Sequence, residues 1–378
     1  MTLHSAPPRG SQPRVPDYAG GCVSNIIPVI LGPRGTAEIP DWMPEDVRGA
    51  RQVILLILDG LGWHQLQQRA SVCPTMTSMS GRSITTIAPT TTVSALTSIT
   101  TGLAPGEHGL VGYRMNMGGR VVQMLRWGDE KGDLRRMYPP DVIQPCPPFM
   151  GAVVPVLSKS ELEGSAFTEA HLRGARACGW RSASSIAVQV RELLSHGHSF
   201  IYAYYDGVDK IAHERGFGEY YDAELRQADR LVADIASVLV PGSVLLITAD
   251  HGQVEVGSNT TALHSRVSAL TTFQSGEGRF RWLHTRPSAI DELWSAAREH
   301  HSDVAWVMRR DELIDGGWFG PRVTDAARQR LGDVALIAHV PTSFEDSADS
   351  GPFPLICRHG ALTDEELDVP LLALGVDN

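Results

Sequence analysis

Several features that define other protein classes are missing from this sequence. Its 378 residues include five cysteines, which are scattered and show no Cys-x-x-Cys spacing. This pattern excludes a disulfide framework and a thiolate metal site, and it fits the reduced thiols of a cytoplasmic protein. No apolar run is long enough to span a bilayer, and the first residues lack the basic-then-apolar pattern of a secretion signal. We therefore expect a cytoplasmic protein without a membrane partner.

An excess of positive charge is also missing. The 33 Lys and Arg residues are outnumbered by 43 Asp and Glu residues, which gives a formal net charge of −10. This balance argues against a nucleic-acid polymer as a partner, because its binding depends on basic side chains. It does not exclude a small anionic substrate, since bound metal cations can reverse the local potential.

The composition changes along the chain, which is long enough to bury a large core. Residues 1–22 are rich in Pro, Gly and Ser and are predicted to form a flexible N-terminal arm. Residues 23–378 are predicted to form one large domain. Within that domain, residues from about 269 to 350 combine short mixed segments with glycines and many charges, which indicates a small inserted subdomain.

Three uninterrupted apolar runs predict buried β-strands. They cover residues 53–58, 200–205 and 244–248, and each has the length of a strand that is buried on both faces of a parallel sheet. Apolar residues at helical spacing lie between the second and third runs: Leu225, Ala228, Val232, Ile235 and Leu239. Strands that alternate with helices predict an α/β fold, with a sheet covered by helices on both faces.

A threonine-rich segment, residues 88–102, predicts a short helix with hydroxyl groups at its start. Thr90, Thr91 and Thr92 follow a proline, and Gly102 would end the helix. A helix N-terminus attracts phosphate through its unpaired N–H groups, and a hydroxyl placed there could act as a nucleophile. The alternative is an ordinary helix capped by Ser or Thr.

Potential metal ligands follow the apolar runs. They are three aspartates and three histidines: Asp59, Asp209, His213, Asp250, His251 and His359. In open parallel sheets, ligands bind beyond the carboxyl ends of the strands, so these side chains are expected to meet beside the threonines. Asp206 competes with Asp209, but the four-residue step from Asp209 to His213 spans one helical turn. The set suits two divalent ions, Zn above all, with Mn or Fe as alternatives.

These residues resemble the alkaline phosphatase superfamily, and within it the nucleotide pyrophosphatase/phosphodiesterase family. The matching motifs occur in the family's order: Asp59-Gly60, Pro89 to Thr92, Thr101-Gly102, His108-Gly109, Asp209 to His213, Asp250-His251-Gly252 and His359-Gly360. The resemblance extends from about residue 50 to the C-terminus. It implies a mixed, mostly parallel sheet flanked by helices, with residues 23–378 as the catalytic domain.

The resemblance also implies roles for individual residues. It makes Thr92 the catalytic nucleophile. It places one metal ion on Asp209, His213 and His359, and the other on Asp59, Asp250, His251 and the Thr92 oxygen. The implied reaction is hydrolysis of phosphodiester or pyrophosphate bonds through a covalent phospho-threonine, with a small phosphate ester or a nucleotide as substrate.

Two departures from the family pattern concern the substrate. Val93, Ser94 and Ala95 replace the family's Phe-Pro-Asn, and Tyr113 falls where the family has an Asn that binds the phosphoryl oxygen. A phenol can also donate a hydrogen bond, although from a different geometry. Tyr113 and, from the end of its strand, Tyr205 are therefore the candidate substrate-binding residues.

Three other functions remain open from the sequence. Within the same superfamily, the chain could be a phosphomonoesterase or a phosphonate hydrolase. The metal ligands alone would also suit a binding protein without turnover. A comparison of diester and monoester substrates distinguishes a phosphomonoesterase from a phosphodiesterase. Bound zinc without any hydrolysis would favour the binding protein.

Overall fold

The computed structural model describes residues 12–349 and 354–376. Half of the predicted N-terminal arm, residues 1–11, lies outside this range. Residues 12–22 form no helix or strand, and Cys22 at their end makes an isolated bridge with Thr85. The flexibility of the arm stays a prediction.

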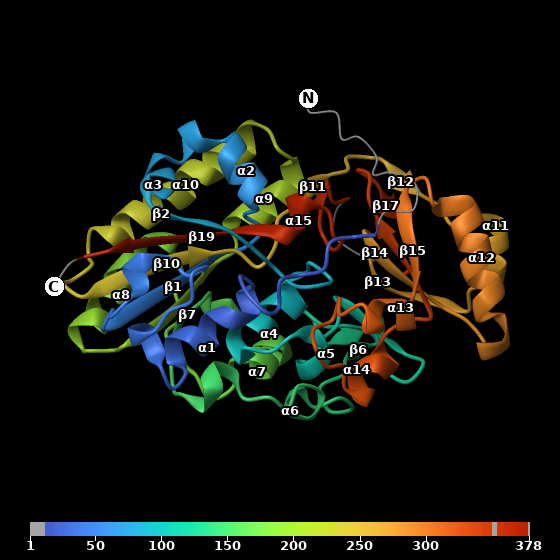
Figure 1. Cartoon of the computed structure of the whole chain (residues 1–378), viewed down its shortest axis with the longest axis horizontal. Helices are drawn as coiled ribbons and strands as arrows, with labels where there is room; N and C mark the ends of the chain where they lie inside the picture. The colour runs from blue at the N-terminus through green and yellow to red at the C-terminus, as the bar shows by residue number, and fades with distance from the viewer. Residues whose placement is uncertain (1–11, 350–353, 377–378) are drawn as a thin grey trace.

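A seven-stranded sheet forms the centre of the molecule (Figure 1), in the order β2-β19-β10-β1-β9-β7-β8. The strands are β1 (Gln52–Leu58), β2 (Ser80–Thr85), β7 (Pro155–Leu157), β8 (Arg176–Ala177), β9 (Phe200–Tyr205), β10 (Ser243–Thr248) and β19 (Asp368–Gly375). β10, β1, β9, β7 and β8 run parallel, whereas β19 is antiparallel to both of its neighbours. All three apolar runs are strands of this sheet, as predicted, and the sheet is mixed and mostly parallel.

Helices cover both faces of this sheet. One layer contains α2 (Trp63–Gln68), α3 (Pro74–Ser78), α8 (Ile186–Ser195), α9 (Gly207–Arg215) and α10 (Glu219–Ala236). The other contains α1 (Ile26–Leu31), α4 (Thr92–Thr101) and α7 (Ala166–Leu172). The predicted helix between the second and third runs is α10, which buries Leu225, Ala228, Val232 and Ile235 and ends before Leu239. No helix in the described part of the chain is long and apolar enough to cross a membrane.

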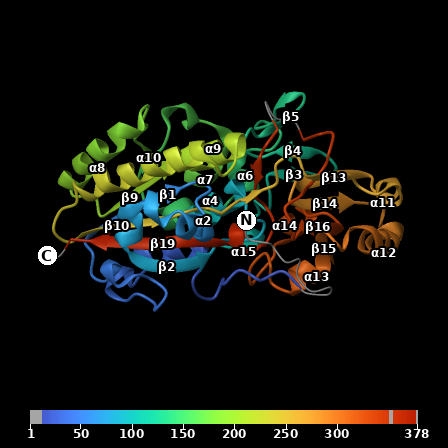
Figure 2. The same ribbon diagram turned by 90° about the horizontal axis from the view of Figure 1, so that it is seen from above.

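A second, antiparallel sheet lies at one end of the molecule (Figures 1 and 2). Its order is β13 (Phe273–Glu277), β14 (Phe280–His284), β16 (Val334–Ala338) and β15 (Ala305–Arg309). The helices of the same part of the chain are α11 (Ser265–Leu270), α12 (Ile290–His301), α13 (Arg310–Asp315) and α14 (Asp325–Arg330). This sheet falls within the segment for which the sequence predicts an inserted subdomain.

Smaller elements join the two sheets. A four-stranded meander consists of β3 (Arg114–Asn116), β4 (Val121–Gln123), β5 (Gly128–Asp129) and β6 (Gly132–Asp133). Two-stranded pairs are β11 (Val254–Glu255) with β18 (Cys357–Arg358), and β12 (Thr260–Thr261) with β17 (Ser343–Phe344). Short helices are α5 (Pro105–His108), α6 (Pro140–Ile143) and α15 (Asp364–Leu367). The β11–β18 pair places the segment that precedes His359 beside the main sheet.

Candidate active site

The carboxyl ends of three parallel strands meet at one edge of the main sheet. Leu58, the last residue of β1, pairs with Tyr205, the last residue of β9, and Ile57 pairs with Thr248 at the end of β10. This register places the residues that follow the strands side by side. Asp59 comes directly after β1 and Asp250 two residues after β10, while α9 begins just beyond β9. The sheet therefore gathers ligands that are far apart in the sequence.

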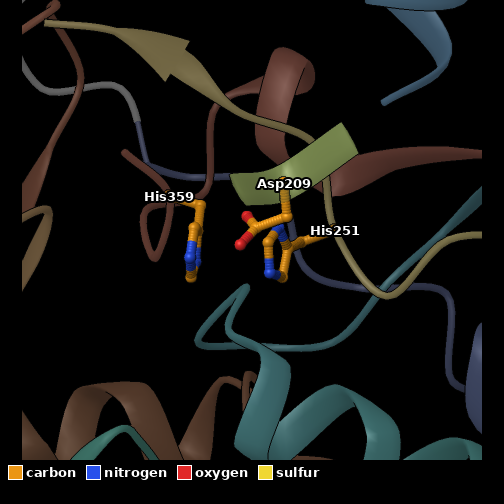
Figure 3. A group of neighbouring side chains, drawn as sticks. All are labelled: Asp209, His251 and His359. Atoms are coloured by element: carbon orange, nitrogen blue, oxygen red, sulfur yellow. The ribbon is translucent and has the colours of Figure 1, made fainter. Parts of the chain in front are cut away.

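The predicted metal ligands come together at this edge. Within the described residues, two groups could each hold a metal ion: Asp209 with His251 and His359, and Asp59 with Asp250 and His251. Figure 3 shows the first group, whose side chains converge on one space from three separate segments. His251 belongs to both groups, so the two candidate ion sites share its ring. The sequence had assigned it to one ion only.

His213 lies beside the first group. Its Nε2 is 3.2 Å from Asp209 Oδ1, and its ring centroid is 5.2 Å from that of His359. Because Asp209 and His213 are four residues apart on α9, they face the same side of that helix. His213 is thus close enough to take part in binding at the Asp209 position.

Backbone carbonyls orient the three histidine rings. His213 Nδ1 lies 2.7 Å from the Cys357 carbonyl oxygen, His251 Nδ1 3.0 Å from that of Gly252, and His359 Nδ1 2.9 Å from that of Thr90. A carbonyl oxygen can only accept, so each Nδ1 carries a proton, and in a neutral ring the Nε2 then keeps its lone pair. Such contacts fix the tautomer of metal-binding histidines. All three rings therefore offer a basic nitrogen to this space.

Two carboxylates keep an oxygen free. The Tyr204 hydroxyl donates to Asp59 Oδ2, and the Gly60 N–H donates to Asp250 Oδ1 over 3.0 Å. The remaining oxygens, Asp59 Oδ1 and Asp250 Oδ2, are buried and have no hydrogen-bond partner within the described structure. Asp250 Oδ2 lies 3.3 Å and Asp59 Oδ1 3.7 Å from His251 Nε2. A buried carboxylate oxygen without a partner raises the free energy of the folded protein. A bound cation would remove this cost.

Asp209 is held by a neighbour that the sequence did not reveal. Gln253 Nε2 donates to Asp209 Oδ1 over 2.9 Å. Gly60 makes room for this contact, since a Cβ there would lie 2.5 Å from Gln253 Nε2 and 2.9 Å from Asp209 Cβ. Gly60 also adopts φ +75°, which disfavours other residues. The glycine after Asp59 is therefore required by the close approach of β1 to α9.

The charges of the site disfavour its metal-free state. Burial raises the pKa of Asp59 well above its ordinary value, and the carboxylates of Asp250 and Asp209 raise it further. Burial also raises the pKa of Asp209 and lowers that of His359, whose ring faces the ring of His251. These pKa shifts arise because several carboxylates and imidazoles lie close together in a region with little solvent. Divalent cations would neutralise the carboxylates and take up the imidazole nitrogens, so the donor set fits metal ions.

Thr92 is the first residue of α4 and faces the ligands. Its Oγ1 lies 3.1 Å from His251 Nε2. The helix begins after Thr91 and ends at Gly102, whose φ of +71° is left-handed, as predicted from the sequence. The Thr90 hydroxyl is engaged elsewhere, since it donates to the Ala361 carbonyl oxygen. Of the three threonines, Thr92 is therefore the one whose hydroxyl meets a metal-binding group.

The other predicted site residues have different partners. The Tyr205 hydroxyl donates to Glu224 on α10, and the Tyr113 hydroxyl accepts from the Gln123 amide on β4. Asp206 pairs with lysines rather than with the histidines, since Lys159 Nζ lies 2.6 Å from its Oδ1. Substrate binding by the two tyrosines stays a prediction.

Two family models match most of the region that builds the site. The model of type I phosphodiesterase / nucleotide pyrophosphatase matches residues 53–171, and the metalloenzyme superfamily model matches residues 180–270. The first match contains Asp59 and Thr92, and the second contains Asp209, Asp250 and His251. Among curated proteins, no sequence matches the chain.

Solved structures share the fold at low sequence identity. Murine ectonucleotide pyrophosphatase / phosphodiesterase 5 is 14% identical, with a TM-score of 0.63 over 86% of this chain and 88% of its own. Phosphonoacetate hydrolase from Sinorhizobium meliloti 1021 is 16% identical, with a TM-score of 0.64 over 87% of this chain and 91% of its own. The two family models therefore confirm the resemblance to the nucleotide pyrophosphatases/phosphodiesterases of the alkaline phosphatase superfamily, and the solved structures confirm the fold.

Proposed function

We propose that this protein is a two-metal hydrolase that cleaves phosphodiester or pyrophosphate bonds in small molecules, with Thr92 as the nucleophile. The main support is one arrangement: three histidines present their Nε2 atoms to buried carboxylates, and Thr92 Oγ1 lies 3.1 Å from one of those nitrogens. A further support is that an inactive threonine-to-alanine variant of the murine phosphodiesterase binds AMP.

The metal ions would be divided between two ends of the ligand cluster. Asp209, His213 and His359 would hold one ion, and Asp59, Asp250, His251 and Thr92 Oγ1 the other. Carboxylate and imidazole ligands of this kind suit zinc. When bound, the two ions would supply positive charge that acidifies the Thr92 hydroxyl and neutralises the phosphoryl oxygens.

The chain's own groups then account for a two-step transfer. Thr92 Oγ gives up its proton to water and attacks phosphorus, and the P–O bond to the leaving group breaks with its electron pair on the departing oxygen, which takes up a proton from water. This step forms a phospho-threonine. Water next attacks phosphorus, and the bond to Thr92 Oγ breaks, which restores the hydroxyl. The N-terminus of α4 stabilises the negative phosphoryl group during both steps.

A substrate panel tests this function. The zinc-loaded protein is expected to hydrolyse bis(p-nitrophenyl) phosphate faster than p-nitrophenyl phosphate. Thr92→Ala should lower kcat by roughly 10⁴-fold or more while zinc content is kept, whereas Thr92→Ser retains a nucleophile and is the matched control. A preference for the monoester would contradict the phosphodiesterase, and full activity in Thr92→Ala would contradict the nucleophile.

Phosphonate hydrolysis is the second candidate. It is favoured by the match to phosphonoacetate hydrolase, which covers 91% of that chain with a TM-score of 0.64. Phosphonoacetate therefore belongs in the panel, with release of inorganic phosphate as the measured product. Turnover of phosphonoacetate above that of the diester would make this second candidate the correct one.

A further inference from the structure

Glu366 of α15 forms a fully buried ion pair with the inserted sheet. Its partner is Arg279, which lies in the tight turn between β13 and β14. Arg279 Nε donates to Glu366 Oε1 over 2.8 Å, and its Nη2 donates to Oε2 over 2.9 Å, which is the two-bond geometry of a strong pair between an arginine and a carboxylate. Arg279 also donates to the carbonyl oxygens of Val340 and Thr342. The inserted part of the chain therefore fixes the position of the Glu366 carboxylate.

The same carboxylate holds the segment that carries His359. The Ala361 N–H donates to Glu366 Oε1 over 3.0 Å. The Thr90 hydroxyl donates to the Ala361 carbonyl oxygen over 2.8 Å and accepts from the Gly360 N–H over 3.0 Å. The Thr90 carbonyl oxygen in turn accepts from His359 Nδ1 over 2.9 Å. A continuous path of hydrogen bonds thus leads from the inserted sheet to a predicted metal ligand.

The backbone of Glu366 contacts a second histidine segment. Its carbonyl oxygen accepts over 2.9 Å from the N–H of Gly252, the residue after His251. The approach is close, since a Cβ at Gly252 would lie 2.0 Å from the Glu365 carbonyl oxygen. This contact needs no side chain at position 366, whereas the contact to the His359 segment does. A change of the Glu366 side chain should therefore act on the His359 segment first.

We propose that Glu366 is a positioning residue for the metal site: its carboxylate, fixed by Arg279, sets the position of His359. A metal ion binds an imidazole nitrogen only within a narrow range of distance, so the backbone that carries the ring has to be held in place. This inference rests on the proposed function, because it takes His359 to be a metal ligand. It gives the inserted sheet a role in the active site, although that sheet supplies none of the predicted ligands.

The test compares two double variants of the full-length protein. Replacement of Glu366 alone would leave Arg279 buried and unpaired, which is strongly destabilising, so both proteins carry Arg279→Met. One also carries Glu366→Gln, whose amide oxygen can still accept from the Ala361 N–H, and the other carries Glu366→Leu, which cannot. Both lack the ion pair, and Gln and Leu are of similar size. A difference between the two proteins therefore reports the lost acceptor.

Zinc affinity, measured by competition with a chromogenic chelator, should differ between the two proteins. Groups that orient metal ligands change metal affinity by about 10- to 100-fold. Because Glu366 acts through the peptide backbone, we expect the lower end of this range: the leucine protein should bind one ion, at Asp209 and His359, about tenfold more weakly than the glutamine protein. The other ion should bind equally in both. Two proteins with the same pair of zinc affinities would overturn the inference.

A second buried ion pair supplies the matched control. Arg114 of β3 lies 2.7 Å from Asp346 Oδ2, and the two side chains are 8% and 9% exposed. Within the described residues, no hydrogen bond joins this pair to the 359–361 segment. Arg114→Met should therefore leave both zinc affinities unchanged. A loss as large as that of the leucine protein would mean that any broken ion pair of this region disturbs the site, and it would overturn the positioning role.

A readout without zinc separates this inference from the proposed function. In the metal-free protein, the ring N–H of His359 that donates to Thr90 should give a proton NMR signal, which His359→Gln identifies. The signal should persist in the glutamine protein and broaden or vanish in the leucine protein, and its persistence in both would overturn the inference. A wild-type protein that binds no zinc would contradict the proposed function, and the ring N–H signals would still decide the role of Glu366.

Discussion

Tyr204 offers a sharp test of how the site holds its metal ions. Its hydroxyl donates to Oδ2 of Asp59, whose other oxygen is free to bind an ion. Tyr204→Phe removes this donor and leaves the ring in place. Asp59 then loses the contact that orients its carboxylate, so we expect weaker binding of the ion that Asp59 shares with Asp250 and His251.

The size of the effect follows from the type of hydrogen bond. A hydrogen bond to a charged group contributes about 1.5–3 kcal/mol, and 1.4 kcal/mol corresponds to tenfold in affinity. Tyr204→Phe should therefore weaken zinc binding at this position by about 10- to 100-fold, the range seen when groups that orient metal ligands are removed. The other ion, near Asp209 and His359, should bind almost as before.

The chain supplies its own control for this variant. Tyr202 lies two residues earlier on the same face of β9, and its buried hydroxyl has no hydrogen-bond partner within the described structure. Tyr202→Phe should leave both zinc affinities unchanged. Competition with a chromogenic zinc chelator measures both constants in each protein. If Tyr204→Phe binds zinc as tightly as Tyr202→Phe does, then Tyr204 does not support the metal site.

Two further predictions concern stability. Removal of the metal ions with EDTA should lower the melting temperature, because Asp59, Asp209 and Asp250 would face one another unneutralised. A ligand at a thousand times its Kd stabilises the folded protein by about 4 kcal/mol. Melting curves that coincide with and without excess zinc would contradict this prediction. Burial lowers the pKa of His171 to about 4. Below its ordinary pKa of about 6.5 the unfolded chain binds a proton that the folded protein does not, so stability falls as pH falls toward 4, by about 2 kcal/mol between pH 7 and pH 5. In urea unfolding with EDTA present, His171→Leu should lack this loss, and parallel curves for the two proteins would refute it.

The sequence predicts the centre of the fold well, for a physical reason. A strand buried on both faces must be apolar at every position, so β1, β9 and β10 stand out as uninterrupted runs. Their carboxyl ends meet by the geometry of a parallel sheet, which is why Asp59 and Asp250 could be identified before their neighbours were known. The family pattern also implied Thr92, and the structure directs its hydroxyl at a ligand.

Contacts between distant segments were not predictable in this way. Gln253 orients Asp209 across 44 residues, and Glu277 packs on Gly360 from another sheet. No spacing rule connects such pairs, because tertiary packing alone brings them together. Tyr204 illustrates the same limit: its strand position indicates burial, but its hydroxyl meets Asp59 only because β1 and β9 are in register.

The measurement that tests the central claim most directly is anomalous X-ray diffraction at the zinc edge from crystals grown with zinc. We predict two anomalous peaks about 3.5–4 Å apart, with Zn–O and Zn–N distances of about 2.0–2.2 Å. One peak should contact Thr92 Oγ1 and His251, and the other Asp209 and His359. A single peak, or two peaks with neither in contact with Thr92, would contradict a two-metal hydrolase that uses this threonine.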